Sequence, residues 1–315
     1  LDAATFGVDY DFSDLNQLAP LTVYSHTDSR DTLERIRGFD IVITNKVVLD
    51  EAVLSMATEL KLICVAATGT NNVDLQFAES RGIQVCNALG YSTHSVAQHC
   101  MALCLELMHK NRQRNQDCLR NWSKSRVFSL VGSQFDELNS KRWGILGLGS
   151  IGRQVAQLAS AFGSEVVYHS VSGRSFHSDY LAVSFEELLR TSDVLSIHTS
   201  LRSETKHLFG HQEFALMKPD VVFLNMARGQ ICEPRALISW LKSGDFLGVG
   251  LDVIDSEPPP NNHTLLNLGD SRVLITPHMA WTSRQSRQRL LAQIVRSIRS
   301  YQREEVLENR VMCNS

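Results

Sequence analysis

The sequence predicts an α/β protein with two parallel-sheet domains, and two observations support that prediction. The chain has 315 residues, about twice the length of a typical single domain. Short apolar runs of strand length alternate with amphipathic stretches of helical length, once before residue 90 and again from Arg142 onward. This alternation is typical of βαβ units, whose strands pair in parallel. We therefore expect two doubly wound parallel sheets.

The first series lies in residues 1–90. Buried parallel strands are expected at residues 40–45 and 61–68, and a shorter strand at 82–87, because each is a continuous apolar run. Residues 50–60 between them have helical spacing. Residues 95–122 then form the longest helical run, and its first half is apolar almost all round. Such a helix suits burial between domains or subunits, so a homodimer is expected.

The second series begins at Arg142, and the last amphipathic helix, about 283–304, carries the chain away from it. Its strand-like runs are residues 143–149, 165–170, 193–200, 221–227, 247–253 and 273–278.

Composition narrows the possible partners. Hydrophobic residues make up 43% of the chain and charged residues 21%, which is ordinary for a globular protein. The net charge of −3 gives no reason to expect a nucleic acid or an anionic membrane as partner. The sequence also lacks an apolar run of membrane-spanning length and the features of a secretory signal at its start. We expect a cytoplasmic protein.

The seven cysteines are scattered and form no CxxC pair. Cys100 and Cys104 lie four apart in a helical segment, so a metal pair is one interpretation. Two buried thiols on one helix face are the alternative that we favour, since free cysteines are usually buried. We expect no metal site and reduced thiols.

The segment Gly147-Leu148-Gly149-Ser150-Ile151-Gly152 fits the pattern GxGxxG. It follows an apolar strand, opens a helix and precedes a second strand, and this context is specific for a Rossmann dinucleotide site. The glycines allow a tight turn, and the free N–H groups of the helix N-terminus can face a pyrophosphate. We expect Gly147, Gly149 and Gly152 to bind a nicotinamide dinucleotide.

The end of the second strand indicates which dinucleotide is bound. A carboxylate expected there would hold the ribose hydroxyls of NAD, but the chain reads Tyr-His-Ser-Val-Ser-Gly-Arg over residues 168–174. Ser170 and Arg174 could instead hold the 2′-phosphate of NADP. NADP is therefore favoured over NAD, although Arg174 as a solvated loop residue remains the alternative.

Three polar residues follow the carboxyl ends of predicted parallel strands, where open α/β sheets bind ligands. They are Arg228, Glu257 and His278. An arginine can bind a substrate carboxylate and polarise a carbonyl, and a histidine can donate a proton as hydride arrives. A glutamate would keep that imidazolium protonated and oriented. Each residue alone would suit a structural role, but together they match what keto-acid reduction requires.

The segments ATGTNNVDL, SVAQH, GLGSIGR, NMARG, GLDVIDSEPP and TPHMAW occur in this order along nearly the whole chain. In them the chain resembles the D-isomer-specific 2-hydroxyacid dehydrogenases, most closely the glycerate dehydrogenase and hydroxypyruvate reductase branch. The resemblance implies two Rossmann-like domains. The substrate domain would comprise residues 1–94 and 284–315, and the dinucleotide domain, residues 95–283, would be inserted into it.

The resemblance also assigns roles. Arg228 would bind and polarise the substrate, His278 would act as general acid and base, and Glu257 would be its carboxylate partner. Further substrate contacts would come from Gly69, Thr70 and Trp281. Further cofactor contacts would come from Thr68, Ser150, Ile151, Thr199, Met226 and Asp252.

The expected function is hydride transfer between NADP or NAD and a small 2-keto or D-2-hydroxy acid, with hydroxypyruvate or glyoxylate as substrate. A nucleotide-sensing regulatory protein of the corepressor kind on the same fold is the alternative, but the intact Arg, Glu and His favour an enzyme. A formate dehydrogenase is the nearest enzymatic rival. That branch replaces the glutamate by Gln, so Glu257 argues for a proton-transferring reduction.

Overall fold

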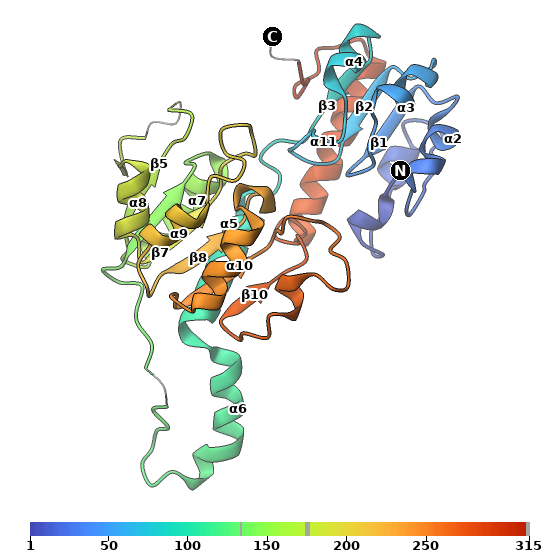
Figure 1. Ribbon diagram of the computed structural model, residues 1–315. Helices are drawn as coiled ribbons and strands as arrows, with labels where there is room; N and C mark the ends of the chain where they lie inside the picture. The colour runs from blue at the N-terminus through green and yellow to red at the C-terminus, as the bar shows by residue number, and fades with distance from the viewer. Residues whose placement is uncertain (133, 174–176, 313–315) are drawn as a thin grey trace. The chain divides into compact units, whose positions relative to one another are not determined.

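The computed structural model describes residues 1–132, 134–173 and 177–312. The chain forms two units, one made of residues 1–92 with the C-terminal residues from 282 onward, and the other of residues 93–281. Each unit has its own parallel sheet, which confirms the predicted α/β class (Figure 1).

The first unit has a parallel sheet of three strands in the order β1-β2-β3. The strands are β1 (Ile41–Thr44), β2 (Leu62–Val65) and β3 (Gln84–Cys86). All four residues of β2 are buried, as expected of a central parallel strand covered on both faces. Two crossover helices, α3 (Glu51–Met56) and α4 (Leu75–Ser80), each begin after an aspartate that accepts a backbone N–H in the first turn.

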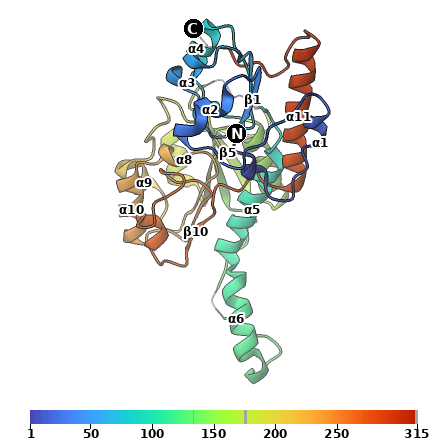
Figure 2. The same ribbon diagram turned by 90° about the vertical axis from the view of Figure 1, so that its right-hand side faces the viewer.

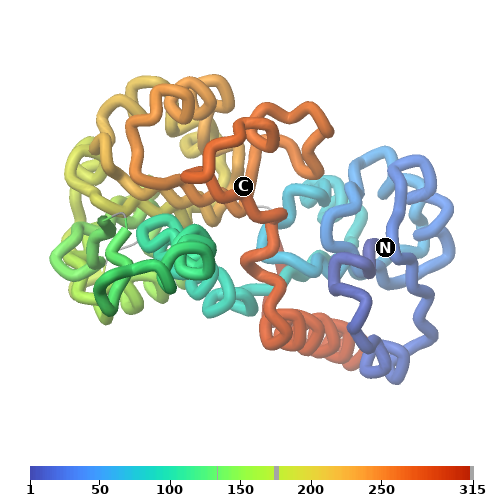
Figure 3. The backbone as a smooth tube through the Cα atoms, turned by 90° about the horizontal axis from the view of Figure 1, so that it is seen from below, coloured from blue at the N-terminus to red at the C-terminus, as the bar shows by residue number. Residues whose placement is uncertain are grey.

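The C-terminal helix α11 (Arg284–Gln302) belongs to this first unit and packs on β2. Figure 3 shows it beside the N-terminal segment, to which several hydrogen bonds link it. The Tyr10 hydroxyl donates to the carbonyl of Arg287 over 2.8 Å, and the Gln302 amide donates to the carbonyl of Leu18 over 3.1 Å. The N-terminal segment itself contains short helices: η1 (Ala3–Phe6), α1 (Ser13–Asn16), η2 (Ser29–Asp31) and α2 (Thr32–Ile36).

The second unit has a seven-stranded parallel sheet in the order β10-β9-β8-β7-β4-β5-β6. Its strands are β4 (Arg142–Leu146), β5 (Glu165–His169), β6 (Leu181–Ala182), β7 (Val194–Ile197), β8 (Val222–Asn225), β9 (Gly248–Leu251) and β10 (Val273–Ile275). The first strand in sequence, β4, lies between β5 and β7, so the chain order reverses there. This is the doubly wound arrangement, whose ligand site lies at the carboxyl ends of the strands around that reversal.

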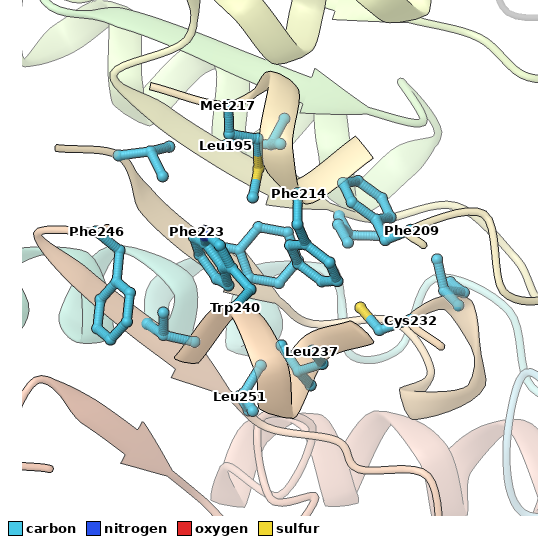
Figure 4. Packing of buried hydrophobic residues seen from close by; sticks show 14 of the residues in the cluster. Leu195, Phe209, Phe214, Met217, Phe223, Cys232, Leu237, Trp240, Phe246 and Leu251 are labelled. Carbon is cyan, nitrogen blue, oxygen red and sulfur yellow. The ribbon is translucent and has the colours of Figure 1, made fainter. Parts of the chain in front are cut away.

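Two hydrophobic clusters cover the two faces of this sheet. Helix α7 (Ser150–Ala161) packs with α5 (Thr93–His109) on one face. Helices α8 (Phe185–Thr191), α9 (His211–Leu216) and α10 (Pro234–Ser243) cover the other. Figure 4 shows the aromatic centre of this second cluster, where the rings of Phe214 and Trp240 stack with centroids 4.9 Å apart. Because both faces of the sheet are buried, the sheet holds the loops at its carboxyl edge in fixed positions.

The expected single helix over residues 95–122 is divided in two. Helix α5 (Thr93–His109) ends at Lys110, which adopts a left-handed conformation with φ of 53°, and α6 (Asn111–Asn121) follows. The apolar residues of α5 pack against α7, β8 and β9 of the same unit, which accounts for its apolar character without a second subunit.

Helix α6 is polar and has no buried residue. It continues into the short helix η3 (Trp122–Lys124), and Figures 1 and 2 show this part of the chain projecting away from the sheet of its own unit. Within residues 1–132, 134–173 and 177–312, no helix is both long and apolar enough to cross a membrane.

Candidate active site

Arg228 lies three residues beyond β8, where a buried asparagine shapes the backbone. The Asn225 side chain is 1% exposed; its amide nitrogen donates to the carbonyl of Arg228 over 3.0 Å, and its oxygen accepts the N–H of Ala227 over 3.0 Å. These two bonds form a tight turn at the end of the strand, and the short helix η4 (Gly229–Ile231) follows at once. The Arg228 backbone is therefore held rigidly, while its side chain is partly exposed.

Gly229 allows the loop of Arg228 to pack against the loop that follows β9. A Cβ atom at this position would lie 1.9 Å from the backbone carbonyl of Ile254, a distance at which no side chain fits. The two loops are also joined by the Gln230 side chain, whose amide donates to the carbonyl of Asp255 over 3.0 Å. Only glycine permits this contact, which places Arg228 near the loop that carries Glu257.

Glu257 and His278 form the ion pair that the sequence predicts. The His278 Nδ1 atom lies 2.6 Å from Glu257 Oε2, and the other carboxylate oxygen accepts the N–H of Ile254 over 3.0 Å. The side chains are 24% exposed for His278 and 34% exposed for Glu257. Because Nδ1 is engaged by the carboxylate, Nε2 is the atom of His278 that remains to exchange a proton with a substrate.

The electrostatics of Glu257 favour its ionised form. Burial raises the pKa of this carboxyl, but four favourable contributions together exceed that effect and the net pKa lies below its usual value. They are the hydrogen bond from His278, the charge of His278, the N–H of Ile254 and the charge of Arg228. A carboxylate between an arginine and a histidine can hold an imidazolium oriented for proton donation.

The predicted dinucleotide loop has the conformation that its glycines require. Gly147 has a φ of 94°, and a Cβ there would lie 2.7 Å from the backbone nitrogen of Thr199. Gly152 approaches the Gly147 carbonyl so closely that a Cβ would lie 2.2 Å from its oxygen. The loop therefore packs tightly on Thr199, which follows β7, and on the first turn of its own helix.

Gly149 is the N-cap of α7, and the first turn of this helix is open to a ligand. No side chain caps it, and a Cβ on Gly149 would meet nothing within 4 Å. Ser150 and Ile151 are the next two residues of the helix, with Ser150 exposed. An uncapped helix N-terminus beside open space fits the pyrophosphate of a dinucleotide.

The other predicted cofactor residues differ in exposure. Thr199 is partly exposed and follows β7 by two residues, whereas Met226 is only 7% exposed and lies in the core cluster on the α5 face. Ser170 follows β5 directly and is partly buried. Arg174 lies outside the described residues.

Asp252 and Trp281 flank the catalytic pair in sequence. Asp252 follows β9, is 2% exposed, and accepts hydrogen bonds from Thr276, Met279 and Ala280. Trp281 is partly buried against the α5-face cluster. The predicted contact of Asp252 with the nicotinamide amide stays a prediction.

The remaining predicted residues, Thr68, Gly69 and Thr70, belong to the other unit. They follow β2 in a loop where the Thr68 hydroxyl donates to the carbonyl of Ala88 over 2.9 Å. The Val73 N–H donates to the carbonyl of Thr70 over 3.0 Å. Backbone N–H groups at Gly69 and Thr70 as substrate ligands remain a prediction.

Sequence reasoning missed four residues that shape this edge of the sheet. Asn225 and Gly229 belong to the motif around Arg228, and a polar residue at the end of an apolar strand was the available signal for Asn225. His99 and Thr276 contact Asp252 or its hydrogen-bond partners from distant parts of the sequence. No local pattern could have paired them.

The two helical cysteines are both buried, and burial raises the pKa of each thiol. Over the part of the chain that the structure describes, no group of three or more His, Cys, Asp or Glu side chains could hold a metal ion.

The chain is similar to several known proteins. Residues 101–280 match the family described as D-isomer specific 2-hydroxyacid dehydrogenase, NAD binding domain. The chain is 33% identical over 274 residues to a glycerate dehydrogenase of Methylorubrum extorquens, covering 85% of this chain and 84% of that protein. It is 33% identical over 299 residues to a hydroxypyruvate reductase of Blautia hydrogenotrophica, covering 93% of this chain and 92% of the relative.

Among solved structures, a D-lactate dehydrogenase of Aquifex aeolicus, complexed with NAD and lactic acid, superposes with a TM-score of 0.86. That protein is 27% identical, and the match covers 98% of both chains.

Proposed function

The chain belongs to the D-isomer-specific 2-hydroxyacid dehydrogenase family, and from that premise we propose that it reduces hydroxypyruvate or glyoxylate with a nicotinamide cofactor. The observation that carries the proposal is the 2.6 Å pair of His278 and Glu257 beside Arg228. Relatives named glycerate dehydrogenase, hydroxypyruvate reductase and glyoxylate reductase support these substrates.

Each residue of the trio has a separate task in the proposed reaction. The Arg228 guanidinium binds the substrate carboxylate and polarises the 2-keto oxygen. When bound, the nicotinamide supplies the hydride that reaches the keto carbon. His278 then gives the proton on Nε2 to the developing alkoxide, so that hydride and proton together convert the keto acid into the hydroxy acid. Glu257 stabilises the imidazolium before the transfer.

The test is a panel of 2-keto acids assayed with NADH and with NADPH, followed by absorbance at 340 nm. We expect turnover of hydroxypyruvate or glyoxylate above that of pyruvate and bulkier acids. Cofactor binding without turnover of any keto acid would favour the nucleotide-sensing alternative. Oxidation of formate without keto-acid reduction would favour a formate dehydrogenase.

The preferred cofactor in this proposal is NADP(H). Its support is the absence of a carboxylate over residues 168–173 at the end of β5, where Ser170 stands instead. The His169 ring is already engaged with the carbonyl of Val183 over 2.9 Å, so Ser170 and Arg174 are the proposed phosphate ligands. A charge-assisted contact of about 1.5–3 kcal/mol corresponds to about 10- to 150-fold in specificity.

Ser170→Asp should reverse the preference by placing a carboxylate against the 2′-phosphate, and Arg174→Ala should weaken NADPH alone. The measurement is kcat/KM for both cofactors in each variant. A wild-type preference for NADH, or equal weakening of both cofactors by Arg174→Ala, would contradict this part of the proposal.

We also propose a homodimer. Its support is the projecting segment from α6 to residue 131, which exposes large apolar side chains: Leu119 at 78%, Trp122 at 52%, Val127 at 65%, Phe128 at 92% and Val131 at 76%. Exposed apolar surface of this kind usually marks a protein partner. Light scattering at micromolar concentration should give the mass of a dimer, and Phe128→Lys should give a monomer. A wild-type monomer would refute this proposal.

A further inference from the structure

His99 reaches the carboxyl edge of the sheet from helix α5. Its Nε2 atom lies 3.0 Å from Thr276 Oγ1 and 3.7 Å from Asp252 Oδ1, and its side chain is only 18% exposed. His99 is part of the motif SVAQH, whose residues have no role in the mechanism above. The three side chains come from α5 and from the residues that follow β9 and β10.

The hydrogen-bond directions in this cluster follow from the number of available protons. The Thr276 hydroxyl has one proton, and it donates that proton to Asp252 Oδ1 over 2.6 Å. Towards His99, Thr276 Oγ1 can then only accept, so His99 must carry a proton on Nε2. His99 thus donates to Thr276, and Thr276 donates to Asp252.

Asp252 is the acceptor at the end of this chain and is 2% exposed. Besides Thr276, its carboxylate accepts the backbone N–H of Met279 and of Ala280, both over 2.9 Å. Burying a carboxylate is costly without donors and a compensating charge. Within residues 1–132, 134–173 and 177–312, the basic side chain that has a nitrogen atom within 4 Å of the Asp252 carboxylate is His99.

The residues that Asp252 holds form the turn of His278. His278 has a φ of 50°, a left-handed conformation that is unfavourable for a non-glycine residue. Its own N–H points back to the carbonyls of Asp252, at 2.8 Å, and of Thr276, at 2.9 Å. The Asp252 carboxylate thus fixes the two residues after His278, while backbone carbonyls fix His278 itself.

We propose that His99 is a positioning residue for the reductase reaction, acting through Thr276 and Asp252 on the turn that presents His278 to Glu257. With the chain of donors intact, the carboxylate keeps one orientation and the turn keeps its left-handed conformation. Without the donor from His99, the Thr276 hydroxyl and the Asp252 carboxylate gain rotational freedom. The His278 imidazole then spends less time at hydrogen-bond distance from Glu257.

The inference rests on the proposed function, since it concerns the residue that donates the proton. Substrate binding by Arg228 should be unaffected, because the Arg228 turn is held separately by Asn225. The network should therefore affect kcat and leave KM for the keto acid unchanged. If the contact between α5 and the sheet were purely structural, its loss would lower stability without a selective effect on kcat.

The test compares two matched pairs of variants at positions 99 and 276. Thr276→Val and His99→Leu keep the approximate shape and remove the donor, whereas Thr276→Ser and His99→Gln keep a donor. We expect the first pair to lower kcat about tenfold, equivalent to about 1.4 kcal/mol, with KM for the keto acid changed less than about twofold. The second pair should recover most of the rate. His94→Gln, an exposed histidine on the same helix, is the control.

A second measurement does not need activity. Hydrogen exchange of the free protein, read by mass spectrometry on peptides covering residues 278–281, should be about five- to tenfold faster in Thr276→Val than in Thr276→Ser. Unchanged exchange and unchanged kcat in Thr276→Val would overturn the inference. A rise in cofactor KM at constant kcat would also overturn it, since the network would then serve cofactor binding. A wild-type protein without reductase activity, but with the exchange difference, would refute the proposed function alone.

Discussion

Replacing Glu257 by Gln removes the charge that holds the His278 imidazolium while keeping the size of the side chain. The two groups are 2.6 Å apart in the native protein. A hydrogen bond between charged groups contributes about 1.5–3 kcal/mol, and about 1.36 kcal/mol corresponds to one pH unit. Because 34% of the Glu257 side chain is exposed to water, the lower end of that range applies, and we expect a change of about one pH unit.

The direction of the change in the pH profile depends on which form of His278 the reduction uses. Reduction needs the protonated imidazole, so kcat/KM falls as pH rises. The carboxylate favours the protonated form, and the pKa of Glu257 lies below its usual value, so its negative charge is present throughout the assay range. Glu257→Gln should therefore move the fall in kcat/KM to lower pH by about one unit.

The assay is the initial rate of keto-acid reduction between pH 5.5 and 9.5 at saturating cofactor. Asp255→Asn is the matched control, because Asp255 lies in the same loop and pairs with a different histidine, His263, at 3.1 Å. The control should keep the wild-type profile. A profile for Glu257→Gln that coincides with the wild type would remove Glu257 from its assigned role.

Three further predictions concern binding and stability. Arg228→Ala should lower kcat/KM in steady-state assays by several orders of magnitude, and Arg228→Lys by less, since lysine keeps the charge but loses the planar guanidinium. Near-normal activity of Arg228→Ala would refute the role of Arg228. Gly229→Ala should destabilise the protein by about 3 kcal/mol or more in urea unfolding, because its Cβ would meet the Ile254 carbonyl at 1.9 Å. The control Gly269→Ala has open space around it and a φ of 70°, so it should cost about 1–2 kcal/mol. Equal losses of stability in the two variants would contradict the close contact at Gly229. Burial lowers the pKa of His198 to about 3, so below about pH 6.5 the unfolded chain takes up a proton that the folded chain cannot. The free energy of unfolding therefore decreases as the pH is lowered from about 6.5 towards 3. Between pH 7.5 and 5 the wild type should lose about 2 kcal/mol more unfolding free energy than His198→Leu, and equal losses would show that His198 is protonated in the folded state.

The strand-end residues were predictable because parallel strands deliver their carboxyl ends to one edge. Arg228, Glu257 and His278 each follow an apolar run, and that position together with their chemistry predicts them as a group. The glycines of the dinucleotide loop were predictable for a related reason, since a strand, a GxGxxG turn and a helix are contiguous in sequence.

The unpredicted features depend on contacts between distant residues or on backbone conformations without a local signal. The partnership of His99 with Thr276 joins residues 177 positions apart, and no periodicity connects them. The helix break at Lys110 requires a left-handed backbone conformation at this lysine, which helical spacing of apolar residues does not predict. The apolar character of α5 predicts burial between domains or subunits, and the structure shows that those side chains pack on the sheet of their own unit.

The reaction proposed for this protein is hydride transfer to a 2-keto acid with proton donation by His278. Its most direct test is reduction of hydroxypyruvate with nicotinamide cofactor deuterated at C4, using both C4 epimers, with the product analysed by mass spectrometry and chiral chromatography. We expect D-glycerate carrying one deuterium at C2 from one epimer only, and a strongly reduced yield with His278→Gln. Absence of product, an unlabelled product, or L-glycerate would contradict it.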